Sequence, residues 1–413
     1  MNTLTRSSST VELPQTAPAA ARAVFRLLRE LRVGTLDVQL PDGSQMHFGT
    51  HAQGAEHQEP RAALRLLDWS ACHAALRSGD IGFAESFIAG GWTTPDLPAL
   101  LKLFIANREA MEDVIFGTWW GSLLYRAKHL LHRNSRRGSR KNIHAHYDIG
   151  NPFYSLWLDE TMSYSSAWFQ GDRAQPLADA QRAKVRRALQ ECRVQPGARV
   201  LEIGCGWGGL AEMAATEFDA HTTGLTLSSE QLDFARGRLQ RLGRAEQADL
   251  RLQDYRDLPE GPFDAVVSIE MFEAVGREYW GSWFRTLRDK LDRDGRACIQ
   301  TITIRDDLFE RYVRSTDFIQ QYIFPGGLLP SREAFRAEAA KVGLRVEREL
   351  AFGADYAETL HRWRLQFMAR DAQVRGQGFD TRFMRIWEFY LAYCEAAFAT
   401  GNTDVVQFTL VHA

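Results

Sequence analysis

The chain has 413 residues, enough for two or three domains of ordinary size. Lysine and arginine number 50 and aspartate and glutamate 52, a net charge of -2 that argues against a surface devoted to nucleic acid. With 45% hydrophobic and 25% charged residues, the composition is that of a globular protein. We find no apolar run long enough for a spanning helix and no secretory signal. Five widely spaced cysteines favour a reduced, cytoplasmic protein without a disulfide framework or metal site.

The N-terminal part of the chain predicts a tail followed by a small α+β domain. Residues 1–19 are rich in Ser, Thr, Pro and Ala, and we expect a flexible tail there. Residues 20–115 form the small domain of our interpretation. It begins with an amphipathic helix from Ala20 to Leu31, followed by a hairpin that turns at Pro41-Asp42-Gly43. Its later helices are broken at Gly79-Asp80.

Residues 116–141 differ from both neighbours, and we predict a basic amphipathic linker helix. From Arg126 to Lys141 this segment carries seven cationic side chains and no acidic one, and Trp119 and Trp120 precede them. Such a segment can lie in a membrane interface, where each cation near anionic lipid gains about 1 kcal/mol. It can equally be a solvated linker helix with one packed face, and both interpretations stay open.

Residues 142–413 alternate strand and helix patterns and form the largest predicted domain. The alternation predicts βαβ units and therefore an α/β fold with a parallel sheet. The last strand, VVQFTLVHA, follows two helical stretches, which fits an antiparallel final strand. The other strand candidates are ARVLEIGCG, AHTTGLTL, ADLRLQD, FDAVVSIEM and GRACIQTITI.

The segment VLEIGCGWGG places Gly204, Gly206 and Gly208 where a strand turns into a helix. Glycines there allow a tight turn and let a ligand approach bare backbone at the N-terminus of a helix. The spacing GxGxG resembles a dinucleotide loop, which alone is a weak signal. Glu202, two residues before the first glycine, and the antiparallel last strand favour S-adenosylmethionine instead. We predict that Glu202 and these glycines bind this cofactor.

Two later segments could complete the cofactor site. At the end of the second strand, where an acid that binds ribose is expected, the available side chains are Thr226 and Gln231. Gln231 also fits a capping box with Ser228, so a ligand contact and a helix cap are equally open. After the third strand, Asp254 and Tyr255 could hold the adenine by hydrogen bonding and stacking. They could also be a helix N-cap and a core aromatic.

Several phrases together resemble the cyclopropane-fatty-acid synthase family, whose members act on fatty acyl chains of phospholipids. The resemblance implies a class I methyltransferase (Rossmann-like) fold with a helical lid, S-adenosylmethionine as methyl donor and a cis double bond as acceptor. It places Tyr164, Ser165 and the triplet His146-Tyr147-Asp148 in the cover over the cofactor. Residues 79–97 resemble the extra N-terminal domain of the longer, bacterial-type members. The phrases occupy residues 144–169, 200–215, 224–235, 252–258, 268–276, 322–331 and 354–363.

Methyl transfer to an alkene leaves a carbocation, which needs a dry pocket with negative or π density nearby. A base must then remove a proton, and the proton that it takes decides between a cyclopropane and a methylene or shifted alkene. In cyclopropane synthases the base is a bicarbonate ion held by Cys, Glu, His and Tyr side chains. By resemblance these four positions are Ser166, Glu273, Gln300 and Tyr356, and a further family His is replaced by Ala274.

Loss of a thiol and an imidazole puts both bicarbonate and ring closure in question, although Ser and Gln can still hydrogen-bond an anion. Glu273 is then the best candidate for a direct base or an ion holder, and a surface acid after a strand is its structural alternative. Our prediction favours bicarbonate slightly.

The leading functional interpretation is a C-methyltransferase of unsaturated phospholipid acyl chains. Its products, a cyclopropane or a methylene or methyl-branched chain, are equally open. We expect an enzyme peripheral to the inner face of the membrane, with a homodimer as an open possibility. The second interpretation is a methyltransferase of a small lipophilic metabolite or amine, because plant alkaloid N-methyltransferases share some of the phrases. The third is a non-catalytic lipid-binding homologue. The intact glycine loop and Glu273 argue against it.

Overall fold

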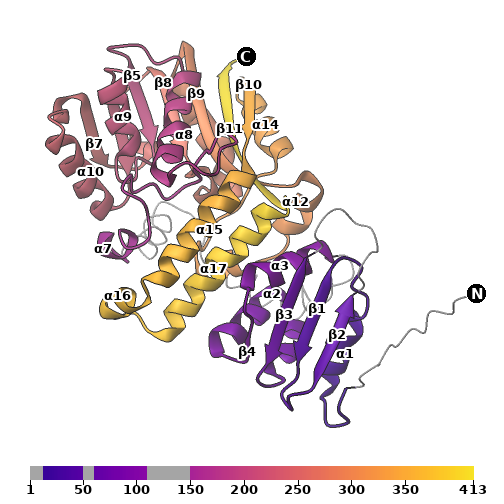
Figure 1. The fold of residues 1–413 in the computed structure, drawn as a ribbon. Coiled ribbons are helices and arrows are strands. Elements are labelled where there is room, and N and C mark those ends of the chain that lie inside the picture. The colour runs from indigo at the N-terminus through magenta and orange to yellow at the C-terminus, as the bar shows by residue number, and fades with distance from the viewer. Residues whose placement is uncertain (1–12, 50–59, 109–148) are drawn as a thin grey trace, which may run out of the picture. The chain divides into compact units, whose positions relative to one another are not determined.

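The computed structural model describes residues 13–49, 60–108 and 149–413 (Figure 1). The chain divides into two compact units at Leu124 and Tyr125, and each is described by itself. The predicted linker helix, 116–141, and most of the predicted tail lie outside the described residues. Among the described helices, none has both the length and the apolar character needed to cross a membrane.

The first unit contains a four-stranded sheet in the order β2-β1-β3-β4. The predicted hairpin is confirmed, because β1 and β2 pair antiparallel on either side of the turn at Asp42. The break predicted at Gly79 is also present: Ser78 and Gly79 leave helical geometry inside α2. The elements are α1 (Ala19–Leu28), β1 (Thr35–Gln39), β2 (Gln45–Gly49), β3 (Arg61–Leu66), α2 (Ser70–Ala89), β4 (Trp92–Thr93) and α3 (Leu97–Ala106).

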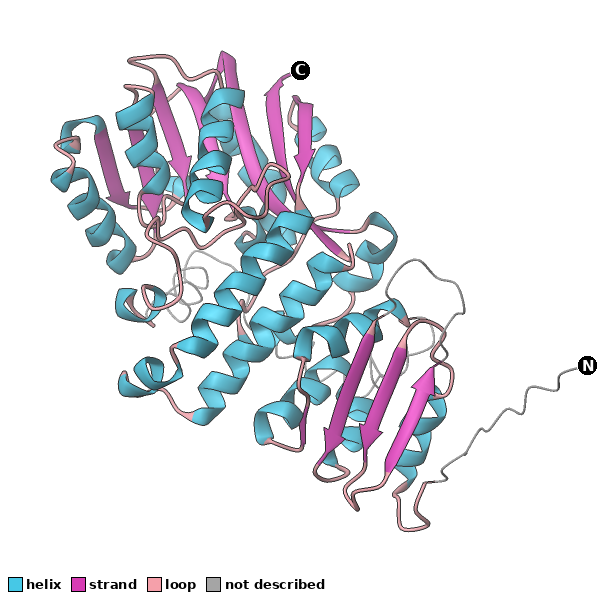
Figure 2. Cartoon of the chain, viewed as in Figure 1, coloured by secondary structure: helices cyan, strands magenta, loops and turns pink. Residues whose placement is uncertain are grey.

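The second unit is built on a seven-stranded sheet in the order β10-β11-β9-β8-β5-β6-β7 (Figure 2). Neighbouring strands from β7 across to β9 are parallel, and β11 is antiparallel to β9, as predicted for the last strand. The strands are β5 (Arg199–Ile203), β6 (His221–Thr226), β7 (Ala248–Leu252), β8 (Phe263–Ile269), β9 (Leu291–Ile304), β10 (Leu344–Ala351) and β11 (Thr403–His412).

Helices cover both faces of this sheet because successive strand residues point to opposite sides. In β5, Leu201 and Ile203 pack in a cluster with Phe284 of α11 and Phe335 of α14, whereas Val200 packs with residues of α8 and α9. The helices are α7 (Asn151–Tyr154), α8 (Leu177–Glu191), α9 (Gly209–Glu217), α10 (Ser229–Arg241), α11 (Trp280–Lys290), α12 (Asp306–Val313), α13 (Phe318–Tyr322), α14 (Arg332–Lys341), α15 (Gly353–Ala369), α16 (Asp371–Gly376) and α17 (Thr381–Ala399). Short 3-10 turns cover Ala245–Gln247, Tyr255–Asp257, Phe272–Ala274 and Arg277–Tyr279.

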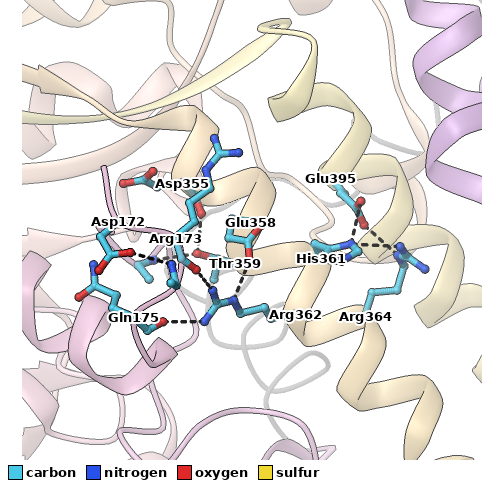
Figure 3. A network of polar contacts seen from close by, with 12 residues as sticks. Asp172, Arg173, Gln175, Asp355, Glu358, Thr359, His361, Arg362, Arg364 and Glu395 are labelled. Carbon is cyan, nitrogen blue, oxygen red and sulfur yellow. Dashed lines mark hydrogen bonds and ion pairs between the residues drawn. The ribbon is translucent and has the colours of Figure 1, made fainter. Parts of the chain in front are cut away.

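Helices α15 and α17 form a pair that extends beyond the carboxyl ends of the parallel strands (Figure 1). Buried Glu395 of α17 accepts from Arg364 Nε at 2.8 Å and contacts His361 Nδ1 at 3.3 Å, both on α15 (Figure 3). This ion pair joins the two helices, which carry residues of the site described next.

Candidate active site

The glycine loop joins β5 to α9 and bends sharply. The backbone nitrogens of Gly204 and Cys205 both donate to Leu225 O on β6, at 2.9 and 2.8 Å. Gly204 has a φ of 92° and Gly206 one of 49°, in the left-handed region that favours glycine. A Cβ at Gly206 would meet no atom within 4 Å, so open space lies beside its backbone.

That open space belongs to a cavity at the carboxyl ends of β5, β6 and β8, which we call the cofactor cavity. Predicted cofactor residues on its wall are Tyr164, Ser165, Glu202, Gly204, Gly206, Thr226, Gln231, Asp254 and Tyr255. Gly208 has a different role, because a Cβ there would lie 2.8 Å from the Ala235 side chain of α10. It allows close packing of the loop against α10.

The chemistry of this wall fits S-adenosylmethionine, which carries a sulfonium and an ammonium group. Glu202 is 4% exposed, and within the described part of the chain its Oε2 atom has no hydrogen-bond partner. Burial raises the pKa of Glu202 well above its ordinary range. A bound cation would supply the missing partner of this carboxylate.

The segments after β6 and β7 were predicted either to contact the cofactor or to serve local structure, and the structure is compatible with both roles. Ser228 caps α10 by accepting from Gln231 N at 3.3 Å, while the Gln231 side chain accepts from Thr226 Oγ1 at 3.0 Å. Asp254 accepts from Arg256 Nη2 at 2.6 Å and Nε at 2.8 Å. Both side-chain pairs remain on the cavity wall, so these residues serve local structure and line the predicted site.

A second, mostly apolar cavity adjoins the first, and we call it the acyl cavity. Tyr164, Glu270 and Ala274 line both cavities, so the two meet at these residues. The small side chain of Ala274 therefore lies at the junction. Other residues on the wall of the acyl cavity include Glu273, Ile302, Tyr312, Phe324, Leu328, Tyr356, Leu360, Tyr390, Tyr393 and Phe398.

At the junction, three of the four predicted base-site residues converge on Glu270. Its Oε1 accepts from Ser166 N and from Gln300 Nε2, both at 2.8 Å. Its Oε2 accepts from the Tyr356 hydroxyl at 2.7 Å. Glu270 directly follows β8 and has a φ of 51°, unusual for a residue with a side chain. Strained conformations of this kind occur at functional sites, where surrounding contacts hold them.

The charge of Glu270 is set by opposing influences. Loss of hydration raises the pKa of its carboxyl, while the Lys184 ammonium and the three hydrogen bonds oppose that shift. Lys184 is 1% exposed and donates to Ser165 Oγ. Burial lowers the pKa of Lys184 to about 8, and the Glu270 and Asp159 carboxylates act against this. Burial is the larger influence, so the pKa of Glu270 lies above its ordinary value, although each of these contacts favours the ionised form.

Glu273, the predicted base or ion holder, lies in the acyl cavity but makes different contacts. Its Oε1 accepts from Ile302 N, and its Oε2 is buried without a hydrogen-bond partner in the described chain. Burial, and then the charge of Glu270, raise the pKa of Glu273 to about 8. The charged form of Glu273 is therefore disfavoured, whereas the ionised form of Glu270 has three hydrogen-bond donors and the Lys184 ammonium beside it. Glu270 is the better-placed candidate for the base.

The expected bicarbonate does not fit this arrangement. Gln300 and Tyr356 already donate to the Glu270 carboxylate, as does the backbone nitrogen of Ser166, whose hydroxyl instead donates to Ala167 O at 2.9 Å. A second anion here would find its donors taken and a like charge beside it. Sequence reasoning missed Glu270, although it lies three residues before Glu273 in SIEMFEAVG. Lys184 was also missed, because nothing in a surface-like helix pattern marks a buried lysine.

The loop after Ser166 is attached to α15, which carries Tyr356. Phe169 N donates to Asp355 Oδ2 at 2.8 Å, and Ala167 N donates to Thr359 Oγ1 at 3.2 Å. Arg362 donates to the carbonyl oxygens of Gln175, at 2.9 Å, and of Arg173 (Figure 3). These contacts fix two of the donors around Glu270 relative to each other.

The model of the mycolic acid cyclopropane synthetase family matches residues 134–408. The tuberculostearic acid methyltransferase UfaA1 of Mycobacterium tuberculosis is 38% identical over 402 residues, 96% of this chain and 92% of the relative. The cyclopropane-fatty-acyl-phospholipid synthase of Escherichia coli is 33% identical over 84% of this chain and 87% of its own.

Among solved structures, the mycolic acid cyclopropane synthase CmaA1, complexed with SAH and CTAB, is similar with a TM-score of 0.61. The two chains are 32% identical, and the match covers 66% of this chain and 97% of the other. The chain therefore belongs to the mycolic acid cyclopropane synthetase family, whose members are S-adenosylmethionine-dependent methyltransferases that form cyclopropanes or methyl branches on fatty acids.

Proposed function

We propose that this enzyme methylates the cis double bond of unsaturated acyl chains in phospholipids, with Glu270 as the base that completes the reaction. One observation carries the proposal: Glu270 is a carboxylate shared by the cofactor cavity and the acyl cavity. A base there reaches both the transferred methyl group and the carbon that accepts it.

The chemistry needs a base after the carbon–carbon bond forms. S-adenosylmethionine supplies an electrophilic methyl group. The alkene π electrons would bond to that methyl carbon while its bond to sulfur breaks and leaves the electron pair on sulfur, as a neutral thioether. The neighbouring alkene carbon would become cationic. The aromatic rings of Tyr164, Tyr356 and Phe398 on the cavity wall supply π density to this cation.

Glu270 then takes one proton from the new methyl group. The electron pair of the broken C–H bond either closes a cyclopropane or, after a hydride has moved from the methyl-bearing carbon to the cationic carbon, forms the C=C bond of a methylene branch. Either way, the carboxylate becomes a neutral carboxylic acid and the acyl chain gains one CH2 unit.

We favour the methylene product, which a separate reductase could convert to a methyl branch, and a cyclopropane is the second candidate. The similarity to a tuberculostearic acid methyltransferase over 96% of the chain supports methyl branching. The acceptance of phospholipids is supported by the similarity to the Escherichia coli enzyme. We further propose that the enzyme works at the inner face of the membrane, with the basic segment from Arg126 to Lys141 as its contact with anionic lipid.

Expression in a host that makes cis-monounsaturated phospholipids tests the proposal. Mass spectrometry of the acyl chains should show a gain of one CH2 unit, and catalytic hydrogenation under conditions that spare the ring should then add two hydrogens to a methylene product. Unmodified acyl chains, together with methyl transfer from labelled S-adenosylmethionine to small amines, would contradict the proposal and favour the alternative methyltransferase function. If the Glu270→Gln variant, present at the same protein level, no longer adds the CH2 unit, the modification depends on this site.

A further inference from the structure

We propose that Arg187 and Gln407 are positioning residues that fix the direction of the Gln300 amide, so that it always donates to Glu270 and keeps this base ionised. The inference rests on the proposed role of Glu270 and adds two residues that line neither cavity. Neither residue was singled out by the sequence patterns, and both lie behind the site, on α8 and β11.

The outer part of this chain of contacts sets the direction of Gln407. Arg187 Nη1 donates to Gln407 Oε1 at 2.5 Å, and Gln407 Nε2 donates to the carbonyl oxygen of Lys184 at 3.0 Å. A guanidinium can only donate and a peptide carbonyl can only accept. Reversing the Gln407 amide would place donor against donor and acceptor against acceptor. Its orientation is therefore fixed from two sides.

The inner part transmits this direction to the base. Gln407 and Gln300 lie opposite each other on β11 and β9. Gln407 Nε2 also donates to Gln300 Oε1 at 3.0 Å, which leaves Gln300 Nε2 to donate to Glu270 Oε1 at 2.8 Å. Both glutamines are 0% exposed, so water does not compete for these bonds. A donor held in this direction favours a carboxylate over a carboxylic acid.

Other titratable groups also face Glu270, and the hydrogen bonds of Gln407 go to Arg187, Gln300 and the Lys184 carbonyl, not to the side chains of these groups. Lys184 of α8 stabilises its charge, Glu273 of the Phe272–Ala274 turn opposes it, and Tyr356 of α15 donates a hydrogen bond. A substitution at Gln407 should therefore shift the pKa of Glu270 without removing the base.

We call the hydrogen bonds from Arg187 through Gln407 and Gln300 to Glu270 the relay. Two variants test it, and the measured quantity is the pH of the acidic limb of the kcat–pH profile on phospholipid vesicles. In Gln407→Met the Gln300 amide is free to turn, and we expect the limb to move upward by half a pH unit or more. In Gln407→Glu the carboxylate pairs with Arg187 and accepts from Gln300, whose oxygen then faces Glu270. The new charge acts in the same direction, so we expect a shift above one pH unit. Turnover should recover on the alkaline side of the limb.

The matched control is Thr409→Val, two residues along the same strand. Thr409 is also 0% exposed, and its hydroxyl donates to Glu191 Oε2 at 3.0 Å, so this variant loses a partly buried hydrogen bond to α8. Its acidic limb should stay at the wild-type pH. An unshifted limb in either folded Gln407 variant, or an equal shift in Thr409→Val, would overturn the relay. Wild-type turnover in Glu270→Gln would instead overturn the base itself, so the two failures are distinguishable.

Discussion

The hydroxyl of Tyr356 should set the acidic limit of activity, and Tyr356→Phe tests this directly. This substitution removes the 2.7 Å hydrogen bond to Glu270 Oε2 and keeps the ring, which packs 4.3 Å from Phe398 between centroids. A hydrogen bond to a charged group contributes about 1.5–3 kcal/mol. Because one pKa unit corresponds to about 1.4 kcal/mol, the pKa of Glu270 should rise by roughly 1–2 units.

The base must be ionised to accept a proton, so a higher pKa moves the acidic limb of the kcat–pH profile to higher pH. Turnover of Tyr356→Phe should fall about 10- to 100-fold at a pH well below the limb, since each pH unit changes the ionised fraction tenfold. It should approach the wild-type rate above the limb. Initial rates with labelled S-adenosylmethionine and saturating vesicles, from pH 5 to 9, give the profile.

Tyr390→Phe is the matched control. It removes a hydroxyl from the same acyl cavity, where Tyr390 contacts the Tyr164 hydroxyl at 2.7 Å and not Glu270. Its acidic limb should coincide with that of the wild type. A Tyr356→Phe limb at the wild-type pH, with any rate loss equal at all pH values, would refute the role assigned to this hydroxyl.

Three further predictions concern the cofactor, stability and charge. Gly206→Asn should abolish S-adenosylmethionine binding in calorimetry, whereas Gly243→Asn, also at positive φ with open space around it, should bind normally; equal binding would contradict the assignment of the cavity. Glu273 has a folded-state pKa of about 8, above the ordinary 4.5, so its contribution to stability is full below pH 4.5 and is lost as pH rises through 8. Glu273→Gln should therefore gain Tm over wild type between pH 5 and pH 9, and a constant difference would count against a protonated Glu273. Lys184→Met should move the acidic limb upward, because the Lys184 charge is the largest influence that lowers the pKa of Glu270; an unmoved limb would show that this charge is screened.

Local patterns predicted the fold of the second unit well. Three features could be recognised from local sequence alone: the glycines at the strand–helix junction, the alternation of strands and helices, and the final strand. The role of Gly208 could not be read this way, since the spacing GxGxG looks the same whether a glycine borders a ligand or a helix. Its closeness to Ala235 depends on how α10 packs against the loop.

The base site was predicted only in part, for a reason of backbone geometry. Ser166, Gln300 and Tyr356 were named from the resemblance, and they do converge. The carboxylate between them was assigned to Glu273, because the family pattern has its glutamate there. Glu270 lies at the junction with a left-handed backbone conformation, at a φ of 51°. The sequence SIEMFEAVG gives no indication of that conformation.

The most direct test of the account compares Glu270→Gln with Glu273→Gln, in buffers with and without bicarbonate, by single-turnover methyl transfer to unsaturated phospholipid vesicles. We predict that Glu270→Gln lowers the rate of product formation about 10²–10⁴-fold, as expected for loss of a general base. Glu273→Gln mimics the protonated side chain and should stay within a few-fold of the wild type, and removal of bicarbonate should change neither wild type nor variant. A wild-type rate in Glu270→Gln, or a wild-type enzyme that stops when bicarbonate is removed, would contradict the assignment of Glu270 as the base.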